Sequence, residues 1–180
     1  MKKPPVKLIE DCIKGKGLAQ KRLFELYKNA MLGICYRYAR DKAEAEDMMI
    51  EGFLNIFKKI HTYAYKGSFA GWMRKTMVCS AIDYYRKYKK ENFHSNIEDQ
   101  NGLVFREPEM LEKLAAEDIL KVIRSLPSGY QMVFNLFVIE GYSHKEIASL
   151  LNISESTSKT QYRKARLQLI KELKDLQLIL

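Results

Sequence analysis

The chain has 180 residues, enough for one medium domain or two small ones. Apolar residues make up 47% of it, whereas only 9 residues are Gly and 4 are Pro, so the composition favours long helices and argues against a loop-rich β-sandwich. Lys and Arg outnumber Asp and Glu by 31 to 22, a formal net charge of +9, which favours an anionic partner, chiefly nucleic acid or an acidic membrane surface.

The three cysteines argue against a disulfide scaffold, because an odd number cannot all pair within one chain. Cys12, Cys35 and Cys79 belong to no CxxC pair and have no His or Cys neighbours at metal-ligand spacing. We therefore expect reduced core thiols, a cytoplasmic protein and no metal site. No apolar run has the length of a membrane span, and the opening MKKPPVKLIE lacks the apolar block of a signal peptide.

The first half of the chain is expected to be helical. Opening helices are predicted over 6–13 and 18–39, with a break at the Gly-Lys-Gly of residues 15–17. A further helix is predicted from 42 to 60, because its apolar residues recur at helical spacing. Its buried stripe is predicted to comprise Met49, Phe53, Ile56 and Ile60, opposite an acidic face of Glu44, Asp47 and Glu51.

A loop over 61–68 leads into the next predicted helix, 69–90, for which Ser68 is the expected N-cap. Phe69, Trp72, Met73 and Thr76 begin its buried stripe. Residues 61–90 carry seven basic side chains and one acidic side chain, and the final YYRKYKK interleaves bases with aromatic residues. This end of the first half is therefore strongly basic.

Residues 91–112 differ from both flanks. They carry six acidic side chains and one basic side chain, and they show neither helical nor strand periodicity. Loops longer than about 12–15 residues are uncommon inside a compact domain. We therefore interpret 91–112 as a flexible acidic linker between two helical domains, 1–90 and 113–180.

The second domain is predicted to begin with a short helix over 114–123 and a turn at LPSG. The helix after that turn has apolar residues at helical spacing, namely Tyr130, Val133, Phe134 and Phe137. Gly141 stands where the end of a helix favours a left-handed residue.

Residues 140–169 have the features that a helix-turn-helix needs at the required spacing. Ser143 and Ser154 are the expected N-caps of its two helices. Asn152 falls at the tight turn, which requires a positive φ that Gly and Asn tolerate best. The first helix is predicted to bury Ile147, Ala148 and Leu151, and Ile153 fills the angle between the helices.

The final helix divides into two faces. Ser158, Tyr162, Ala165 and Leu169 are predicted to pack inward. The outer face is short, polar and basic, and it comprises Ser156, Lys159, Thr160, Arg163 and Lys164. In this motif the N-terminal half of the second helix enters the major groove, where Lys and Arg read guanine edges or bind phosphates. The pattern therefore predicts DNA binding.

Two separated segments resemble the bacterial sigma factors of the extracytoplasmic-function (ECF) class, which are small two-domain initiation subunits of RNA polymerase. The resemblance lies in residues 45–60 and 69–87 of the first half and in 126–169 of the second. It implies an all-α protein of two small helical domains, an N-terminal helical bundle and a C-terminal helix-turn-helix domain, joined by a flexible linker. It also implies that the protein is not an enzyme and has no cofactor or small-molecule substrate.

The resemblance assigns a role to each part. Residues 1–90 become a region 2-like domain that docks on core RNA polymerase and recognises and melts the −10 element of promoter DNA. The acidic linker, 91–112, enters polymerase channels, although an ordinary solvated linker would have the same composition. Residues 113–180 become a region 4-like domain that recognises the −35 element.

The implied site residues fall into three groups. Those that match the polymerase-docking surface are Asp47, Met48, Glu51 and Asn55. Those of the −10 loop and helix are His61, Tyr63, Tyr65, Lys66, Ser68, Arg74, Lys75, Arg86 and Lys87. Those that match the −35 reading face are Ser156, Thr157, Lys159, Thr160, Arg163 and Lys164, with Ser143 and Lys145 on the DNA backbone.

Some positions depart from the family pattern. They are Ile50, Gly52, Ala70 and Cys79 in the first domain, and Asn152, Ser156 and Ser158 in the second. Two alternatives stay open: a stand-alone helix-turn-helix regulator, and a metal-dependent nucleic-acid enzyme that uses Glu44, Asp47 and Glu51. Members of the class are commonly inhibited by an anti-sigma factor, and the residues leave open whether this chain has one.

Overall fold

The computed structural model describes residues 4–88 and 111–176, with side chains from residue 118 onward in the second range. Every regular element in these ranges is a helix, and no strand occurs in them, so the all-α prediction is confirmed. The helices form two compact units that divide between Tyr84 and Tyr85, and each is described by itself. The predicted linker, 91–112, lies almost entirely outside the described residues.

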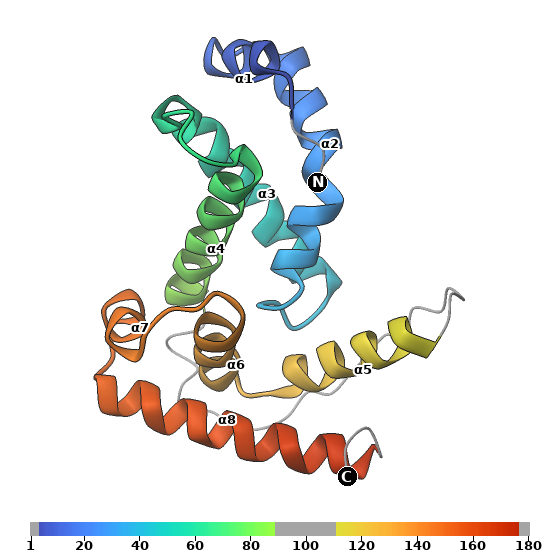
Figure 1. The fold of residues 1–180 in the computed structure, drawn as a ribbon, viewed down its shortest axis with the longest axis vertical. Coiled ribbons are helices and arrows are strands. Elements are labelled where there is room, and N and C mark those ends of the chain that lie inside the picture. Colours follow the sequence, from blue (N-terminus) through green and yellow to red (C-terminus); the bar gives the residue numbers. More distant parts are fainter. Residues whose placement is uncertain (1–3, 89–110, 177–180) are drawn as a thin grey trace. The chain divides into compact units, whose positions relative to one another are not determined.

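The first unit contains four helices and one short 3-10 turn (Figure 1). They are α1 (Val6–Ile13), α2 (Gly17–Cys35), α3 (Lys42–Lys59), η1 (Ile60–Thr62) and α4 (Phe69–Tyr88), whose last four residues lie beyond the division. The ranges agree closely with the predicted ones, except that α2 ends at Cys35 and a turn continues to Tyr38. Helix α2 packs against both α1 and α3.

Helix α3 begins where Asp41 caps it, because the Asp41 carboxylate accepts a hydrogen bond of 2.8 Å from the Glu44 N–H. Its last turn carries Lys58 and Lys59, whose charges favour the negative end of the helix dipole. The predicted buried stripe of Met49, Phe53, Ile56 and Ile60 is confirmed.

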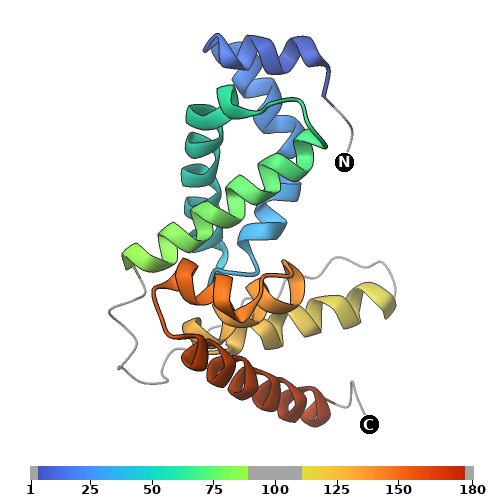
Figure 2. The same ribbon diagram turned by 60° about the vertical axis from the view of Figure 1, so that its left-hand side comes forward.

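Helices α3 and α4 cross (Figures 1 and 2), and Gly52 of α3 lies against the side chain of Met77 of α4. A Cβ atom built on Gly52 would overlap Sδ of Met77 and lie 2.7 Å from its Cε. Met77 is completely buried, so its side chain has little space into which it can move. The glycine that departs from the family pattern therefore makes room for a large side chain of α4.

The second unit contains α5 (Leu111–Ser125), α6 (Ser128–Phe134), the π-helical turn η3 (Asn135–Ile139), α7 (His144–Leu151) and α8 (Glu155–Asp175). Helix α8 packs against α5, α6 and α7 (Figure 1). A hydrophobic cluster in the core of the second unit packs α8 against the end of α5, and it comprises Val122, Ile123, Leu126, Ala165 and Leu169. Gly141 has a φ of +77°, as predicted for the residue that ends the preceding helix.

None of the three cysteines forms a disulfide, and the prediction of buried core thiols is confirmed for Cys12 and Cys35, whereas Cys79 is half-buried. Burial raises the pKa of the Cys35 thiol to about 12, which keeps it protonated and unreactive. None of the helices in the described ranges is long and apolar enough to cross a membrane.

The contact between Gly52 and Met77 predicts that Gly52→Ala destabilises the first unit. Overpacking a core costs about 1–3 kcal/mol, and the better helix propensity of Ala returns about 1 kcal/mol, so we expect a net loss of up to about 2 kcal/mol. Urea denaturation followed by the fluorescence of Trp72, the single tryptophan of the chain, measures this loss. The matched control is Gly33→Ala in α2, where a Cβ meets nothing within 4 Å and which should be neutral or stabilising. Equal stability of the two variants would contradict the prediction.

Candidate nucleic-acid interface

Helix α7 starts with a reciprocal capping box, which confirms Ser143 as its N-cap. The Ser143 hydroxyl accepts a hydrogen bond of 3.3 Å from the Glu146 N–H, and the Ser143 N–H donates to the Glu146 carboxylate at 2.8 Å. The same hydroxyl lies 2.7 Å from that carboxylate. Ser143 is therefore engaged locally, whereas the neighbouring Lys145 is exposed.

The turn between α7 and α8 has the predicted geometry. Asn152 adopts a left-handed conformation with φ 53° and ψ 51°. The Ile153 N–H donates back to the Ala148 carbonyl at 3.1 Å, and Ser154 then caps α8 by accepting from the Thr157 N–H at 3.0 Å. The helix-turn-helix prediction is therefore confirmed.

A cluster of aromatic and polar side chains fastens the start of α7 to α8. The His144 ring stacks on Phe137 with centroids 4.3 Å apart, and both rings contact Tyr162. Nδ1 of His144 lies 3.0 Å from the Ser158 hydroxyl. Neither His144 nor this hydrogen bond was predicted from the sequence. The hydrogen bond can form because Ser158 replaces the apolar residue that is usual at this position in the family.

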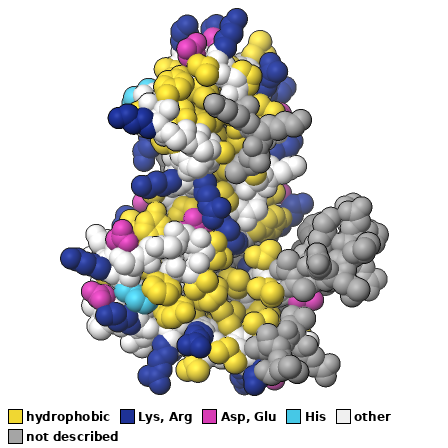
Figure 3. All heavy atoms as spheres, in the orientation of Figure 1, with side chains coloured by type: hydrophobic (Ala, Val, Ile, Leu, Met, Phe, Trp, Pro, Cys, Tyr) yellow, Lys and Arg dark blue, Asp and Glu magenta, His cyan; other side chains and the backbone are white. Residues whose placement is uncertain are grey.

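The outer face of α8 is exposed at Ser156, Lys159, Thr160, Arg163 and Lys164, as predicted. In the view of Figure 3, Lys and Arg side chains lie along the lower edge of the molecule, where α8 runs in Figure 1. These five side chains come from the first half of α8, the part of this motif that enters a major groove.

Several of these groups already have partners. The Lys159 ammonium lies 2.6 Å from the Glu155 carboxylate, and this hydrogen bond and charge hold the pKa of Glu155 below its ordinary value. The hydroxyls of Ser156 and Thr157 lie 2.8 and 2.7 Å from that of Ser154. The tip of α8 is thus pre-ordered by short local contacts.

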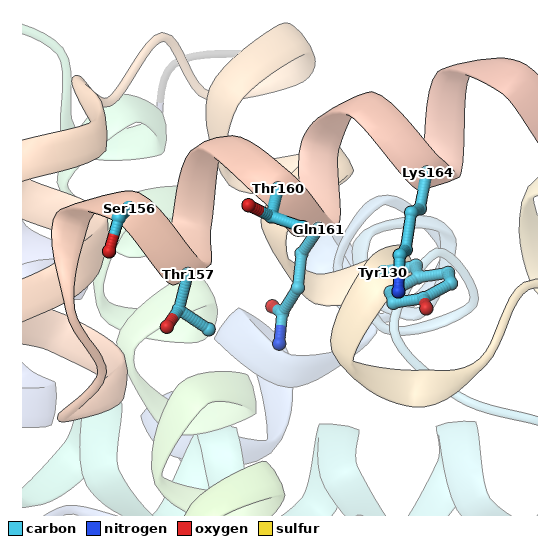
Figure 4. Close-up of a pocket in the computed structure, with 6 residues that line it drawn as sticks. All are labelled: Tyr130, Ser156, Thr157, Thr160, Gln161 and Lys164. Carbon is cyan, nitrogen blue, oxygen red and sulfur yellow. The ribbon is translucent and has the colours of Figure 1, made fainter.

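A hollow of about 290 Å³ opens between the start of α6 and the first half of α8 (Figure 4). Its lining residues are Tyr130, Ser156, Thr157, Thr160, Gln161 and Lys164. Tyr130 and Gln161 were absent from the predicted site. Gln161 could have been found, because it stands three residues after Ser158 and four before Ala165, on the buried stripe.

The loop 61–68 presents its two tyrosines differently. Tyr63 is 8% exposed, donates a hydrogen bond of 2.9 Å to the Gly67 carbonyl, and packs on Phe69 and Trp72. Tyr65 is 49% exposed and has a φ of +58°, a conformation that non-glycine residues rarely adopt. Tyr63 is therefore part of the core, and Tyr65 is the aromatic side chain that the loop offers to solvent.

The other predicted residues of this loop, His61, Lys66 and Ser68, are exposed. Of the predicted residues on α4, Arg74 is half-buried, whereas Lys75, Arg86 and Lys87 are exposed. The Lys87 ammonium lies 4.5 Å from the centroid of the Tyr88 ring, a cation–π distance.

The predicted docking residues on α3 also differ in how far they are exposed to solvent. Asp47 is exposed and Glu51 is half-exposed, but Met48 is 1% exposed and offers no surface to a partner, because it belongs to the buried stripe of α3. The Asn55 amide donates to the Ser80 hydroxyl of α4 at 3.1 Å. Ile50 and Leu54, 52% and 55% exposed, stand one helical turn apart on the same outer surface.

Within residues 4–88 and 111–176 no group of three His, Cys, Asp or Glu side chains is placed to hold a metal ion. Glu44, one of the three acids in the metal-enzyme alternative, lies beside the Asp41 cap at the start of α3.

Comparison with known proteins gives two family matches in chain order. Residues 23–91 match the family model described as sigma-70 region 2, and residues 116–169 match the one described as sigma-70, region 4. Together the two models span more than half of the chain.

Two relatives match over most of their own length and most of this chain. The chain is 28% identical over 181 residues to the ECF RNA polymerase sigma factor SigW of Bacillus subtilis, which covers 94% of this chain and 97% of that protein. It is 27% identical over 150 residues to SigM of the same organism, covering 82% of this chain and 90% of that protein. The sigma factor RpoE of Bartonella quintana, solved with the anti-sigma factor NepR, has a similar fold, with a TM-score of 0.53 at 17% identity, covering 86% of this chain and 96% of that one.

The left-handed turn predicts opposite results for two substitutions of Asn152. Asn152→Ala should destabilise the second unit by about 1–2 kcal/mol, because a Cβ-bearing residue without a polar side chain is strained there. Asn152→Gly should be close to neutral. Helical circular dichroism during thermal unfolding measures the difference, while Trp72 fluorescence should report an unchanged first unit. Equal loss in both variants would show that the Asn152 side chain, rather than the backbone, matters.

Proposed function

Because the chain belongs to the extracytoplasmic-function class of the sigma-70 family, we propose that its two helical units divide promoter recognition between them. The protein binds core RNA polymerase and directs it to specific promoters, where it recognises −10 and −35 elements and promotes DNA melting. We assign docking and −10 recognition to residues 1–90, the connection to 91–112, and −35 recognition to 113–180.

The observation that carries the −35 assignment is the exposed polar and basic face on a capped, correctly turned α8. Arg163 and Lys164 supply cations, Thr160 supplies a hydroxyl, and all three project from the half of the helix that enters a major groove. Lys159 joins them when it exchanges its Glu155 partner for DNA. Ser156 and Thr157 belong to the same surface, and Lys145 contacts the backbone from α7, beside the Ser143 cap.

For the −10 element we assign base stacking to Tyr65, since it is the exposed aromatic side chain of the loop. Tyr63 supports that loop from inside through its hydrogen bond to Gly67. The polar and basic groups that surround a captured base or its phosphates are His61, Lys66, Ser68, Arg74, Lys75, Arg86 and Lys87.

For polymerase docking we propose the outer surface of α3. Asp47 and Glu51 supply negative charge, and Ile50 and Leu54 supply exposed apolar area beside it. Asn55 is positioned by Ser80 at the edge of this surface. Met48 contributes from inside, by holding α3 on the core.

The family consists of transcription initiation factors rather than enzymes, and we propose that this chain has no catalytic activity of its own. We also propose a cytoplasmic location, where it would meet core polymerase and DNA. The related fold of RpoE was solved with an anti-sigma factor, which supports such a partner for this chain as a prediction.

The assignment of α8 predicts that Arg163→Ala or Lys159→Ala weakens binding to the −35 duplex and leaves polymerase affinity unchanged. We expect each substitution to lower affinity for the duplex about tenfold. Loss of a guanine contact should also relax the base preference, whereas loss of a phosphate contact should reduce the salt dependence. Fluorescence anisotropy with the reconstituted holoenzyme measures both. Lys171→Ala removes the same charge from the other half of α8 and should bind normally. An equal effect of Lys171→Ala would place the interface elsewhere.

The assignment of α3 predicts that the double charge reversal Asp47→Lys and Glu51→Lys lowers affinity for core polymerase by at least about tenfold, because like charges then meet across the interface. Titration of labelled protein with core polymerase gives the affinity, and run-off transcription on genomic fragments gives the function. Glu10→Lys, an exposed acid on α1, is the matched control. Unchanged affinity would locate docking on another surface, and no affinity of the wild type would favour a stand-alone regulator.

A further inference from the structure

The hollow beside α8 has an unusual lining for a surface depression. Thr157, Gln161 and Lys164 recur at i, i+4 and i+7, and Figure 4 shows all three on the same side of the helix. This flank turns away from Arg163 and toward Tyr130 at the start of α6. The hollow therefore adjoins the proposed reading face without lying at its centre.

The most informative group in the hollow is the Gln161 carboxamide. Gln161 as a whole residue is only 5% exposed, but its amide is not one of the fully buried unpartnered groups of the described residues, so the amide is accessible from the hollow that it lines. An accessible carboxamide can donate hydrogen bonds from its two N–H groups and accept them at its oxygen, so it can bind a polar ligand. The amide lines the hollow, where a ligand could reach it (Figure 4).

The remaining lining groups share one chemical property. Every polar side chain around the hollow can donate a hydrogen bond: the hydroxyls of Ser156, Thr157, Thr160 and Tyr130, the amide N–H groups of Gln161 and the ammonium of Lys164. No acidic side chain lines it. A ring of donors with one positive charge suits an anionic oxygen group such as a phosphate.

We propose that the hollow is a phosphate seat, in which one backbone phosphate of the −35 duplex is bound by Lys164, Gln161 and Tyr130. This inference rests on the proposed role of α8 and extends it to two residues outside the predicted site. In this motif the centre of the recognition helix reads base edges, and contacts to the sugar–phosphate backbone fix its register. The position of the hollow on the flank of α8 favours the backbone contact.

Tyr130 also explains how such a seat would be kept in place. Its ring packs on the core of the second unit, against the cluster that joins α5 to α8, while the residue still lines the hollow. A phosphate bound between Tyr130 and α8 would therefore be held by two helices. Gln161 and Tyr130 act as positioning residues that set where along the groove the reading face lies.

The test uses the full chain with core polymerase and a duplex that the wild type selects from a randomised pool. Each phosphate of the −35 segment is replaced singly by an uncharged methylphosphonate. We expect one phosphate whose neutralisation weakens wild-type binding about tenfold, because hydrogen bonds to a charged group are lost there. In Gln161→Leu, binding should be about tenfold weaker on every duplex sequence alike, and neutralising that phosphate should add little further loss.

Two variants control for folding and position. Tyr130→Phe removes only the hydroxyl and keeps the ring on the core, so it should reproduce a smaller form of the same pattern even if Gln161→Leu folds poorly. Gln168→Leu changes the same residue type on α8, where the amide bonds Glu172 at 2.9 Å outside the hollow, and should retain the full wild-type pattern. Inorganic phosphate should compete with the duplex no better than chloride at equal ionic strength.

Three results would overturn the seat. The first is a full methylphosphonate penalty in both Gln161→Leu and Tyr130→Phe. The second is a change of preferred base in Gln161→Leu, which would make Gln161 a base reader. The third is displacement of the duplex by free phosphate, which would make the hollow a small-anion site. If the wild-type holoenzyme selects no −35 sequence, the proposed role of α8 fails, and the seat fails with it. If it selects one and the variants leave the pattern unchanged, only the seat fails.

Discussion

The fixed angle between α7 and α8 is the constraint on which the second unit depends, because it decides which side of α8 faces outward. Local chemistry sets most of it: a capping box at Ser143, a left-handed Asn152 and a second cap at Ser154. The His144 ring then ties the two helices together through Phe137 and Ser158. Each contact is modest, at about 1 kcal/mol for a cap or a neutral hydrogen bond, but all of them favour the same geometry. A rigid angle lets a reading helix present its side chains without reordering on contact.

In the first unit, a single helix contributes both to the core and to an exposed surface. Helix α3 buries Met48 and Met49 and still exposes Asp47, Ile50 and Leu54. Gly52 lets the side chain of Met77 of α4 lie against the backbone of α3. The exposed apolar pair beside the acids gives the proposed docking surface both apolar area and negative charge.

The elements and their ends were predictable from the sequence because they depend on neighbours within one or two helical turns. Apolar spacing placed α3 and α4, and capping residues placed α7 and α8 within a residue of where they begin. What the sequence could not distinguish was which of two similar side chains the tertiary contacts bury. Tyr63 lies inside and Tyr65 outside because Phe69 and Trp72 take up only one of them. The spacing of Gln161 from Ser158 and Ala165 indicates that it is buried, but its place in a hollow depends on α6, which packs beside it.

The short contact between Glu155 and Lys159 has a consequence for how the protein encounters duplexes of the wrong sequence. An internal carboxylate already neutralises a cation at the tip of α8, much as a phosphate would. In the proposed binding mode, a non-target duplex breaks the Glu155–Lys159 pair without forming a base contact, whereas a matched site replaces the pair with a contact to a base or phosphate. In this mode, DNA would therefore release fewer mobile counterions than the number of bases on α8 suggests, and non-specific affinity would be lower than the charge of α8 implies. A positively charged chain can thereby avoid being trapped on the far larger excess of non-target sequence.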